Sequence, residues 1–142
     1  KHISQQLAKL GCMQAKTFKI TFPEWLIPEL HHHFIRGYFD GDGCIMVGKK
    51  YHGPSFRITG TASFVTRVQE IMMKEIGLNK TKLDTLHKSS ERHVFNMGYV
   101  GTNSCKKIYK WLYKDATISL ARKHQKFTIV NNSLSCSSYL EM

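Results

Sequence analysis

Residues 34–45 carry the strongest structural signal in this 142-residue chain and read Phe-Ile-Arg-Gly-Tyr-Phe-Asp-Gly-Asp-Gly-Cys-Ile. A helical apolar pattern runs into Asp40 and Asp42, which one glycine separates. Residues two apart do not share a helical face, so we expect the two carboxylates to do different jobs. Gly41 and Gly43 are expected to let the chain leave the helix by unusual dihedral angles. One carboxylate can then bond local backbone groups while the other projects beyond the helix end.

A projecting carboxylate with open positions beside it suits Mg²⁺, which takes oxygen ligands and retains water. The alternative is an ordinary capped turn, because Asp-Gly-Asp-Gly is common turn chemistry. Gly37 and Gly41 lie four residues apart on one face of the expected helix, and small residues at that spacing let two helix backbones pack closely. A glycine in a helix interior costs about 1 kcal/mol. That cost favours close contact with another helix over a glycine that only makes room inside its own core.

The charge of the chain indicates a polyanionic partner. Lys and Arg total 21 against 10 Asp and Glu, which gives a net charge of +11 and a pI near 9.6. Nucleic acid is the usual partner of such a protein, an anionic membrane is the second, and solubility alone is the alternative. No run approaches the ~18 apolar residues of a membrane-spanning helix, and no signal peptide opens the chain, so we expect no membrane partner and an intracellular location. Cysteines at positions 12, 44, 105 and 136 lack the spacing of a zinc site and are expected to be reduced thiols.

Hydrophobic periodicity and turn residues predict alternating helices and paired strands. The expected order is a helix over 28–40, strands over 44–50 and 55–61, a helix over 63–77 capped by Ser63, strands over 81–88 and 92–100, a helix from 102 or 103, and a last helix capped by Asp115 that runs to about 130. Strands that come in hairpins predict an antiparallel sheet, with helices on one face and alternating polar side chains on the other. A β-ribbon is one of the few elements that enters the major groove of DNA.

Residues 35–43 resemble the nine-residue signature of the LAGLIDADG homing endonucleases. Residues 56–61, 111–117 and 120–127 resemble later segments of that family, and the order of elements is similar too. The resemblance covers about residues 24–130 and implies an α+β fold of αββαββα order, with helices on one face of a curved, antiparallel, four-stranded sheet. It also implies that two motif helices pack about a twofold or pseudo-twofold axis, and that each sheet faces a DNA major groove.

The resemblance assigns separate roles to the residues of the motif. The second acid, Asp42, is implied to bind a divalent metal and to be catalytic. Asp40 is implied to be structural at the helix end, and Gly37 and Gly41 are implied to form the interface with the second motif helix. The expected cofactor is Mg²⁺ or another divalent cation.

A basic residue near the scissile phosphate is also implied by the family. Lys123 is the candidate, with Arg122 as the alternate, and its charge would steady the water network or the transition state. An ordinary solvated helix charge is the alternative for Lys123.

The implied fold also selects candidate DNA-binding residues by strand alternation from Asp42. Arginine and lysine suit guanine edges and asparagine suits adenine, although each residue can instead contact phosphate, which gives affinity without sequence information. The candidates are Met46, Gly48, Lys50, Arg57, Thr59, Thr61, Lys82, Lys88, Arg92 and Asn96.

The mechanism implied by the family needs two motif carboxylates, and this chain supplies one. The second motif helix comes either from a homodimer partner or from a preceding repeat of a longer chain. Residues 1–23 resemble the end of a preceding repeat or a linker, so we favour a two-repeat origin. Residues 24–130 are expected to form the domain, and residues 131–142 a flexible tail.

The resemblance predicts a site-specific double-strand DNA endonuclease that makes staggered cuts and belongs to an intron, an intein or a free-standing mobile element. One alternative keeps the fold without DNA cutting, as an RNA maturase or a non-cleaving sequence-specific nucleic-acid-binding protein. The other is a basic nucleic-acid-binding component without sequence preference.

Overall fold

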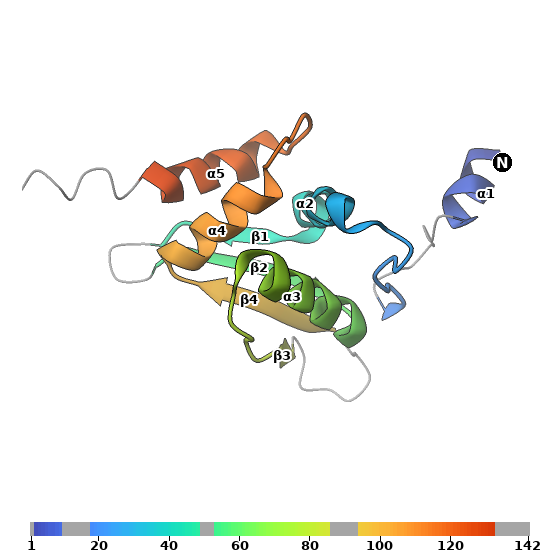
Figure 1. Cartoon of the computed structure of the whole chain (residues 1–142), viewed down its shortest axis with the longest axis horizontal. Coiled ribbons are helices and arrows are strands. Elements are labelled where there is room, and N and C mark those ends of the chain that lie inside the picture. The colour runs from blue at the N-terminus through green and yellow to red at the C-terminus, as the bar shows by residue number, and fades with distance from the viewer. Residues whose placement is uncertain (1, 10–17, 49–52, 86–93, 133–142) are drawn as a thin grey trace, which may run out of the picture.

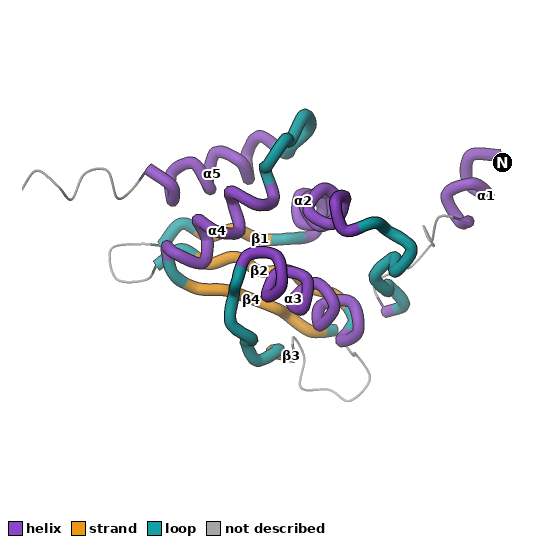
Figure 2. Tube along the Cα trace, viewed as in Figure 1, coloured by secondary structure: helices purple, strands orange, loops and turns teal. Residues whose placement is uncertain are grey.

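A four-stranded antiparallel sheet lies at the centre of the protein, in the order β1-β2-β4-β3 (Figures 1 and 2). The structure, a computed structural model, describes residues 2–9, 18–48, 53–85 and 94–132. The strands are β1 (Cys44–Met46), β2 (Ser55–Gly60), β3 (Asp84–Thr85) and β4 (Phe95–Val100). The helices are α1 (His2–Lys9), α2 (His31–Asp42), α3 (Ala62–Ile76), α4 (Thr102–Leu112) and α5 (Ala121–Asn132), and the 3-10 turn η2 (Pro28–Leu30) precedes α2.

The helices cover one face of the sheet. Strand side chains alternate between the two faces, and the buried apolar ones point toward the helices. Phe56 and Ile58 of β2 and Met97 of β4 are fully buried, whereas Arg57 between them is exposed. Helices α3 and α4 pack on β2 and β4, and α1 lies apart from the sheet (Figure 1). The predicted α+β class, the order of elements from the 28–40 region onward and the antiparallel hairpins are confirmed.

Helix α2 is held by one buried face. Ile35 and Phe39 are fully buried, and the Phe39 ring lies 4.9 Å from the Phe56 ring and 5.6 Å from the Phe127 ring, centroid to centroid. Each fully buried side chain of this size contributes about 1.5–3 kcal/mol of hydrophobic free energy. The contacts place the C-terminal end of α2 between the sheet and α5.

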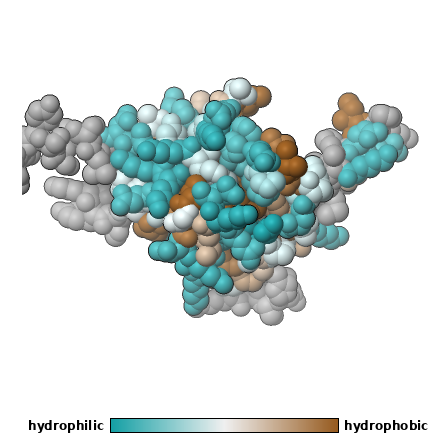
Figure 3. Space-filling view, viewed as in Figure 1, coloured by the Kyte–Doolittle hydropathy of each residue, from teal (hydrophilic) through white to brown (hydrophobic). Residues whose placement is uncertain are grey.

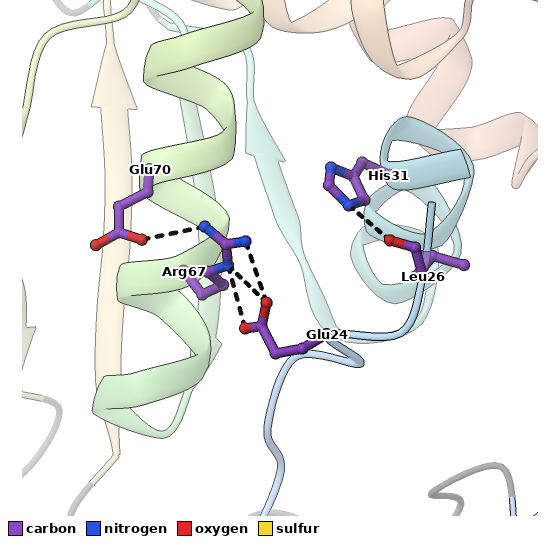
Figure 4. A network of polar contacts seen from close by, with 5 residues as sticks. All are labelled: Glu24, Leu26, His31, Arg67 and Glu70. Atoms are coloured by element: carbon purple, nitrogen blue, oxygen red, sulfur yellow. Dashed lines mark hydrogen bonds and ion pairs between the residues drawn. The ribbon is translucent and has the colours of Figure 1, made fainter. Parts of the chain in front are cut away.

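The segment that leads into α2 is tied to α3 by an exposed ion-pair network (Figure 4). Arg67 donates through Nε to both carboxylate oxygens of Glu24, each at 3.1 Å, and its Nη1 lies 3.4 Å from Glu70 Oε2. His31 Nε2 lies 3.2 Å from the Leu26 carbonyl oxygen. Exposed pairs contribute at most about 1 kcal/mol, so this network orients the entry to α2 more than it stabilises the fold.

Helix α3 begins at Ala62, and its N-cap is Thr61, two residues before the predicted cap Ser63. Thr61 Oγ1 accepts a hydrogen bond from the Phe64 N–H at 3.2 Å and donates one to the Ile20 carbonyl at 2.6 Å. Strand β2 therefore ends at Gly60. The prediction that Thr61 extends the groove-facing strand is wrong, because capping α3 and binding Ile20 occupy its hydroxyl.

Helix α5 begins at Ala121, so the prediction that Asp115 caps the last helix is also wrong. Asp115 has a φ of 53° and lies in residues 113–120, which connect α4 to α5. Ile118, in the same connecting segment, is 82% exposed. This connecting segment is held by Arg36 of α2, which donates to its backbone. An apolar spacing alone could not reveal that contact.

Two predicted strands are shorter in the structure than in the sequence-based prediction. Strand β1 ends at Met46, and of the described residues 81–85 in the next predicted strand, Asp84–Thr85 form β3. Lys82 is exposed immediately before β3. Three candidate DNA-binding residues, Lys50, Lys88 and Arg92, lie outside the described residues, as does most of the predicted tail over 131–142.

Candidate active site and nucleic-acid interface

Asp40, in the last turn of α2, bonds the segment that connects α4 to α5. The Leu120 N–H donates to Asp40 Oδ2 at 3.0 Å, and the Tyr113 hydroxyl donates to Oδ1 at 3.3 Å. Burial and the Asp40 charge raise the pKa of Tyr113. Both carboxylate oxygens therefore have partners, and the side chain joins two parts of the fold.

Asp42 lies two residues further on and is exposed. Within the described ranges, no hydrogen bond or ion pair holds its carboxylate. The chain turns immediately afterwards, where the Gly43 N–H donates to the Phe39 carbonyl at 2.8 Å. The two aspartates thus differ as expected: one is bound by the fold and the other projects from the helix end.

Glycine is needed at position 43 because a side chain would not fit there, and not because of the dihedral angles. Its φ of −79° and ψ of 167° are open to any residue, but a Cβ there would overlap the Phe39 ring and lie 2.8 Å from the Phe39 carbonyl oxygen. Gly41 belongs to α2 and has helical geometry. The prediction that these glycines adopt unusual dihedral angles is wrong, since Gly43 instead allows the backbone to pass close to Phe39.

Tyr38, one helical turn before Asp42, joins α2 to β2. Its hydroxyl donates to the Thr59 carbonyl at 2.7 Å. Burial and the charge of Asp42 raise the pKa of Tyr38 to about 12, so the phenol stays protonated as a donor at neutral pH. Sequence analysis missed this residue, although its position four residues before Asp42 was a usable signal.

Arg36 is a second residue that sequence analysis missed. It is only 8% exposed. Its Nη1 donates to the Leu112 carbonyl at 2.9 Å and its Nε to the Ile118 carbonyl at 3.2 Å. Arg36 and Asp40 lie four residues apart on α2, and both hold the 113–120 connection.

Lys123 of α5 lies against the end of α2. Its Nζ donates to the Phe39 carbonyl at 2.5 Å and to the Asp40 carbonyl at 2.9 Å, and it lies 4.8 Å from the centroid of the Phe39 ring. The side chain is 4% exposed, so the alternative of a solvated helix charge is wrong for Lys123; Arg122 is the exposed one. A cation at a helix C-terminus also interacts favourably with the helix dipole.

The electrostatic surroundings of Lys123 include the motif carboxylates. Burial lowers its pKa, and the neighbouring charge of Arg122 lowers it further. The charges of Asp40, Cys44 and Asp42 act in the opposite direction. Burial is thus the largest influence on the pKa of Lys123, and the acidic groups oppose it only in part.

The face of α2 that carries Gly37 and Gly41 is open. A Cβ on either glycine would meet no atom within 4 Å, so the alternative that they make room inside their own core is wrong. A groove of about 440 Å³ runs beside Gly37 and is lined by His33, Arg36, Gly37, Asp40, Ile118, Ser119 and Leu120.

A hydrophobic patch over the beginning of α2 interrupts a mainly hydrophilic surface (Figure 3), and the exposed apolar residues there include Ile27 and Leu30.

The uncovered face of the sheet collects the predicted groove-facing side chains of three strands. Met46 and Arg57 are exposed, and Thr59 donates through Oγ1 to Asn96 Oδ1 at 2.5 Å. Gly48 is exposed beyond the end of β1. Four candidates from β1, β2 and β4, namely Met46, Arg57, Thr59 and Asn96, thus lie on the same uncovered face of the sheet.

The donor set fits a divalent cation as half of a site. Nowhere in the described part of the chain do three His, Cys, Asp or Glu residues form a group able to hold a metal. Asp42 offers one exposed carboxylate, and Mg²⁺ is commonly bound by one or two carboxylates together with waters and substrate phosphate oxygens. Among the described helices, none has the length and apolar character needed to cross a membrane.

Comparison with known proteins supports the fold. No protein-family model and no curated protein matches the sequence. Among solved structures, the LAGLIDADG homing endonuclease I-LtrWI bound to target DNA superposes with a TM-score of 0.50 at 12% identity, over 77% of this chain and 38% of that one. The homing endonucleases I-CvuI and I-CeuI, both in complex with DNA, give TM-scores of 0.47 and 0.48 at 18% and 11% identity.

These matches cover 72% of this chain and 64% of I-CvuI, and 92% of this chain and 61% of I-CeuI. The chain therefore spans less than two thirds of the length of each of the three proteins. It has the fold of the LAGLIDADG homing endonucleases.

Proposed function

We propose that this chain forms one half of a site-specific double-strand DNA endonuclease that acts inside the host cell of a mobile element. The observation that carries the proposal is the difference between the two motif acids: Asp40 is bound by the fold, and Asp42 is exposed without a hydrogen bond or ion pair to any described residue. The chain that carries this carboxylate has a net charge of +11, which suits a polyanionic duplex.

Asp42 would hold a divalent cation, Mg²⁺ or another, together with phosphate oxygens of the DNA. When bound, such an ion lowers the pKa of water and stabilises charge on the attacking and leaving oxygens. The residues of this chain set the geometry: Tyr38 ties α2 to β2, and Lys123 holds the carbonyl groups at the helix end. Two such carboxylates, one for each DNA strand, would produce a staggered cut.

The partner that completes the site would be a second motif helix, from a homodimer partner or from a preceding repeat. The open Gly37 and Gly41 face supports this proposal, because it allows close approach of another backbone, and the groove beside it is adjacent to the exposed Ile118. Unlike a glycine enclosed in its own core, each exposed glycine costs stability without improving the packing of this chain.

Gly37→Ala is expected to stabilise the isolated chain and weaken its pairing. The new methyl group enters open space, so the helix should gain about 0.5–1 kcal/mol in the free energy of unfolding. The same methyl group would separate two paired helices. Urea unfolding at low protein concentration measures the first effect, and sedimentation with and without duplex measures the second. Asn103→Ala, an exposed neutral change on α4, should leave pairing unchanged; equal pairing of Gly37→Ala and the original chain contradicts this interface.

Selection from a random duplex library tests the function directly. The chain is incubated with the library in Mg²⁺ or EDTA, and bound and cut molecules are sequenced separately. We expect enrichment of one site under both conditions and cutting in Mg²⁺ alone. Enrichment without cutting favours the non-cleaving binder, and a parallel incubation with structured intron RNA identifies a maturase. Salt-sensitive binding without any enrichment favours a basic component without sequence preference.

A further inference from the structure

Arg57 crosses the uncovered face of the sheet from β2 toward β4, over Gly98. The two residues are directly paired in the β2–β4 register. A Cβ on Gly98 would lie 3.3 Å from Arg57 Cγ and 4.0 Å from Arg57 Nε. The arginine side chain, from Cγ to Nε, therefore lies over the space that any other residue at position 98 would fill.

Gly98 faces the uncovered side of the sheet, because its neighbours Met97 and Tyr99 are buried under the helices. A glycine inside a strand weakens the strand and usually marks a bulge, a sharp bend or a close approach. A bulge is excluded here, since β2 and β4 pair residue by residue from Ser55↔Val100 to Gly60↔Phe95. Two groups make the close approach: the Arg57 side chain, and the Phe56 backbone carbonyl oxygen, which would also lie 3.3 Å from a Cβ at position 98.

The next pair along the same two strands limits the space beside the arginine. Thr59 lies opposite Asn96, and the Thr59 hydroxyl donates to the Asn96 amide oxygen at 2.5 Å. This bond holds the Asn96 side chain across the strands. Arg57 thus has a bare backbone beneath it at Gly98 and a fixed polar pair at one side.

We propose that Gly98 is a specificity-determining position, which acts by letting Arg57 lie flat across the sheet and so directs its guanidinium to a guanine edge in the major groove. This inference rests on the proposed function. A guanidinium fork binds guanine O6 and N7 in a bidentate manner, and holding the side chain in advance reduces the entropy lost on binding. Gly98 makes no base contact of its own; it is a positioning residue for Arg57.

The test compares base preferences in binding selections from the random duplex library in EDTA. The original chain is expected to prefer guanine at the position read by Arg57. Gly98→Ala and Arg57→Lys should both lose roughly 10-fold or more of that preference, at the same position and at no other. Affinity for non-specific duplex should remain within about threefold, because the positive charge is kept. Val100→Ala, an exposed change on the same strand and face, should leave the profile intact.

Stability measurements separate this role from a purely structural one. The added methyl group of Gly98→Ala crowds both Arg57 Cγ and the Phe56 carbonyl oxygen. Arg57→Ala is therefore expected to recover the part of any fall in Tm that comes from the arginine side chain, and not the part that comes from the Phe56 backbone. The double variant should also lose no more base preference than Arg57→Ala alone. A lower Tm with an unchanged base profile, or a changed preference at a position that Arg57→Lys leaves intact, overturns the proposal. If the original chain enriches no sequence at all, the proposed function itself fails, and this inference fails with it.

Discussion

Asp42→Asn is expected to abolish DNA cutting while the fold and sequence-specific binding are retained. The amide has nearly the same shape but lacks the charge that would hold a divalent cation. Because the carboxylate is exposed and has no protein partner in the described part of the chain, the free energy of unfolding should change by less than about 0.5 kcal/mol. Loss of several kcal/mol of transition-state stabilisation corresponds to at least a ~1000-fold slower cut. Cleavage of a labelled duplex that carries the selected site measures this rate.

Asp40→Asn is the matched comparison, with the opposite pattern expected. Its carboxylate accepts from the Leu120 N–H and the Tyr113 hydroxyl, and weakening such partly buried bonds costs about 1–3 kcal/mol. Asp40→Asn should therefore lower Tm, whereas Asp42→Asn should not. If Asp42→Asn cuts DNA at the normal rate, Asp42 does not hold the catalytic metal. If the variant loses DNA binding as well as cutting, Asp42 is needed for more than catalysis.

Lys123→Met is expected to reduce stability and cutting together. Methionine fills a similar volume but cannot donate to the carbonyl groups of Phe39 and Asp40. The Phe39 carbonyl still accepts a hydrogen bond from the Gly43 N–H. The variant therefore loses mainly the hydrogen bond to the Asp40 carbonyl and the interaction of the lysine charge with the helix dipole. We expect a cost of about 2–4 kcal/mol in the free energy of unfolding, measured by urea denaturation. Arg122→Met removes the neighbouring exposed charge and should change stability by less than about 0.5 kcal/mol.

The kinetic pattern of Lys123→Met distinguishes two roles. If Lys123 positions Asp42 through the end of α2, the variant should lose stability and also require a higher Mg²⁺ concentration for cutting. If the ammonium instead contacts the reacting phosphate, the maximal cutting rate should fall with unchanged stability and an unchanged Mg²⁺ dependence. The two carbonyl bonds favour the first outcome.

The pH dependence of stability gives an independent check on Lys123. Burial lowers its native pKa below the ordinary value of 10.5, so the unfolded chain binds more protons between those two values. The free energy of unfolding should therefore rise with pH from the lowered native pKa of Lys123 up to about 10.5, and should rise no further above that pH. The free energy of unfolding, measured by denaturation at several pH values, should show this rise for the original chain and not for Lys123→Met. The same pH dependence in both proteins would contradict a lowered pKa of Lys123.

The different positions of Asp40 and Asp42 were predicted from the sequence because their determinants are local, although the helix runs two residues further than predicted and its glycines have ordinary dihedral angles. The spacing of Asp40 and Asp42 assigns them to different sides of the helix, and Gly37 and Gly41 share a face, whatever the rest of the chain does. The pairing of β1 with β2 follows from the turn residues between them, and the exposed positions of β2 follow from strand alternation. The Ser63 and Asp115 caps failed because several residues nearby are able to cap a helix, and packing selects among them.

Helical and strand periodicity, with the motif itself, established the fold class and the two distinct aspartates before any coordinates. The roles of Arg36, Lys123 and Gly98 needed the tertiary structure. Arg36 and Lys123 donate to carbonyl groups 76 to 84 residues away, and Gly98 is explained by a side chain on the neighbouring strand. Every residue has a backbone carbonyl, so residue types cannot show which distant carbonyl a buried cation will meet. That choice is made by the packing of α2 against the connection before α5.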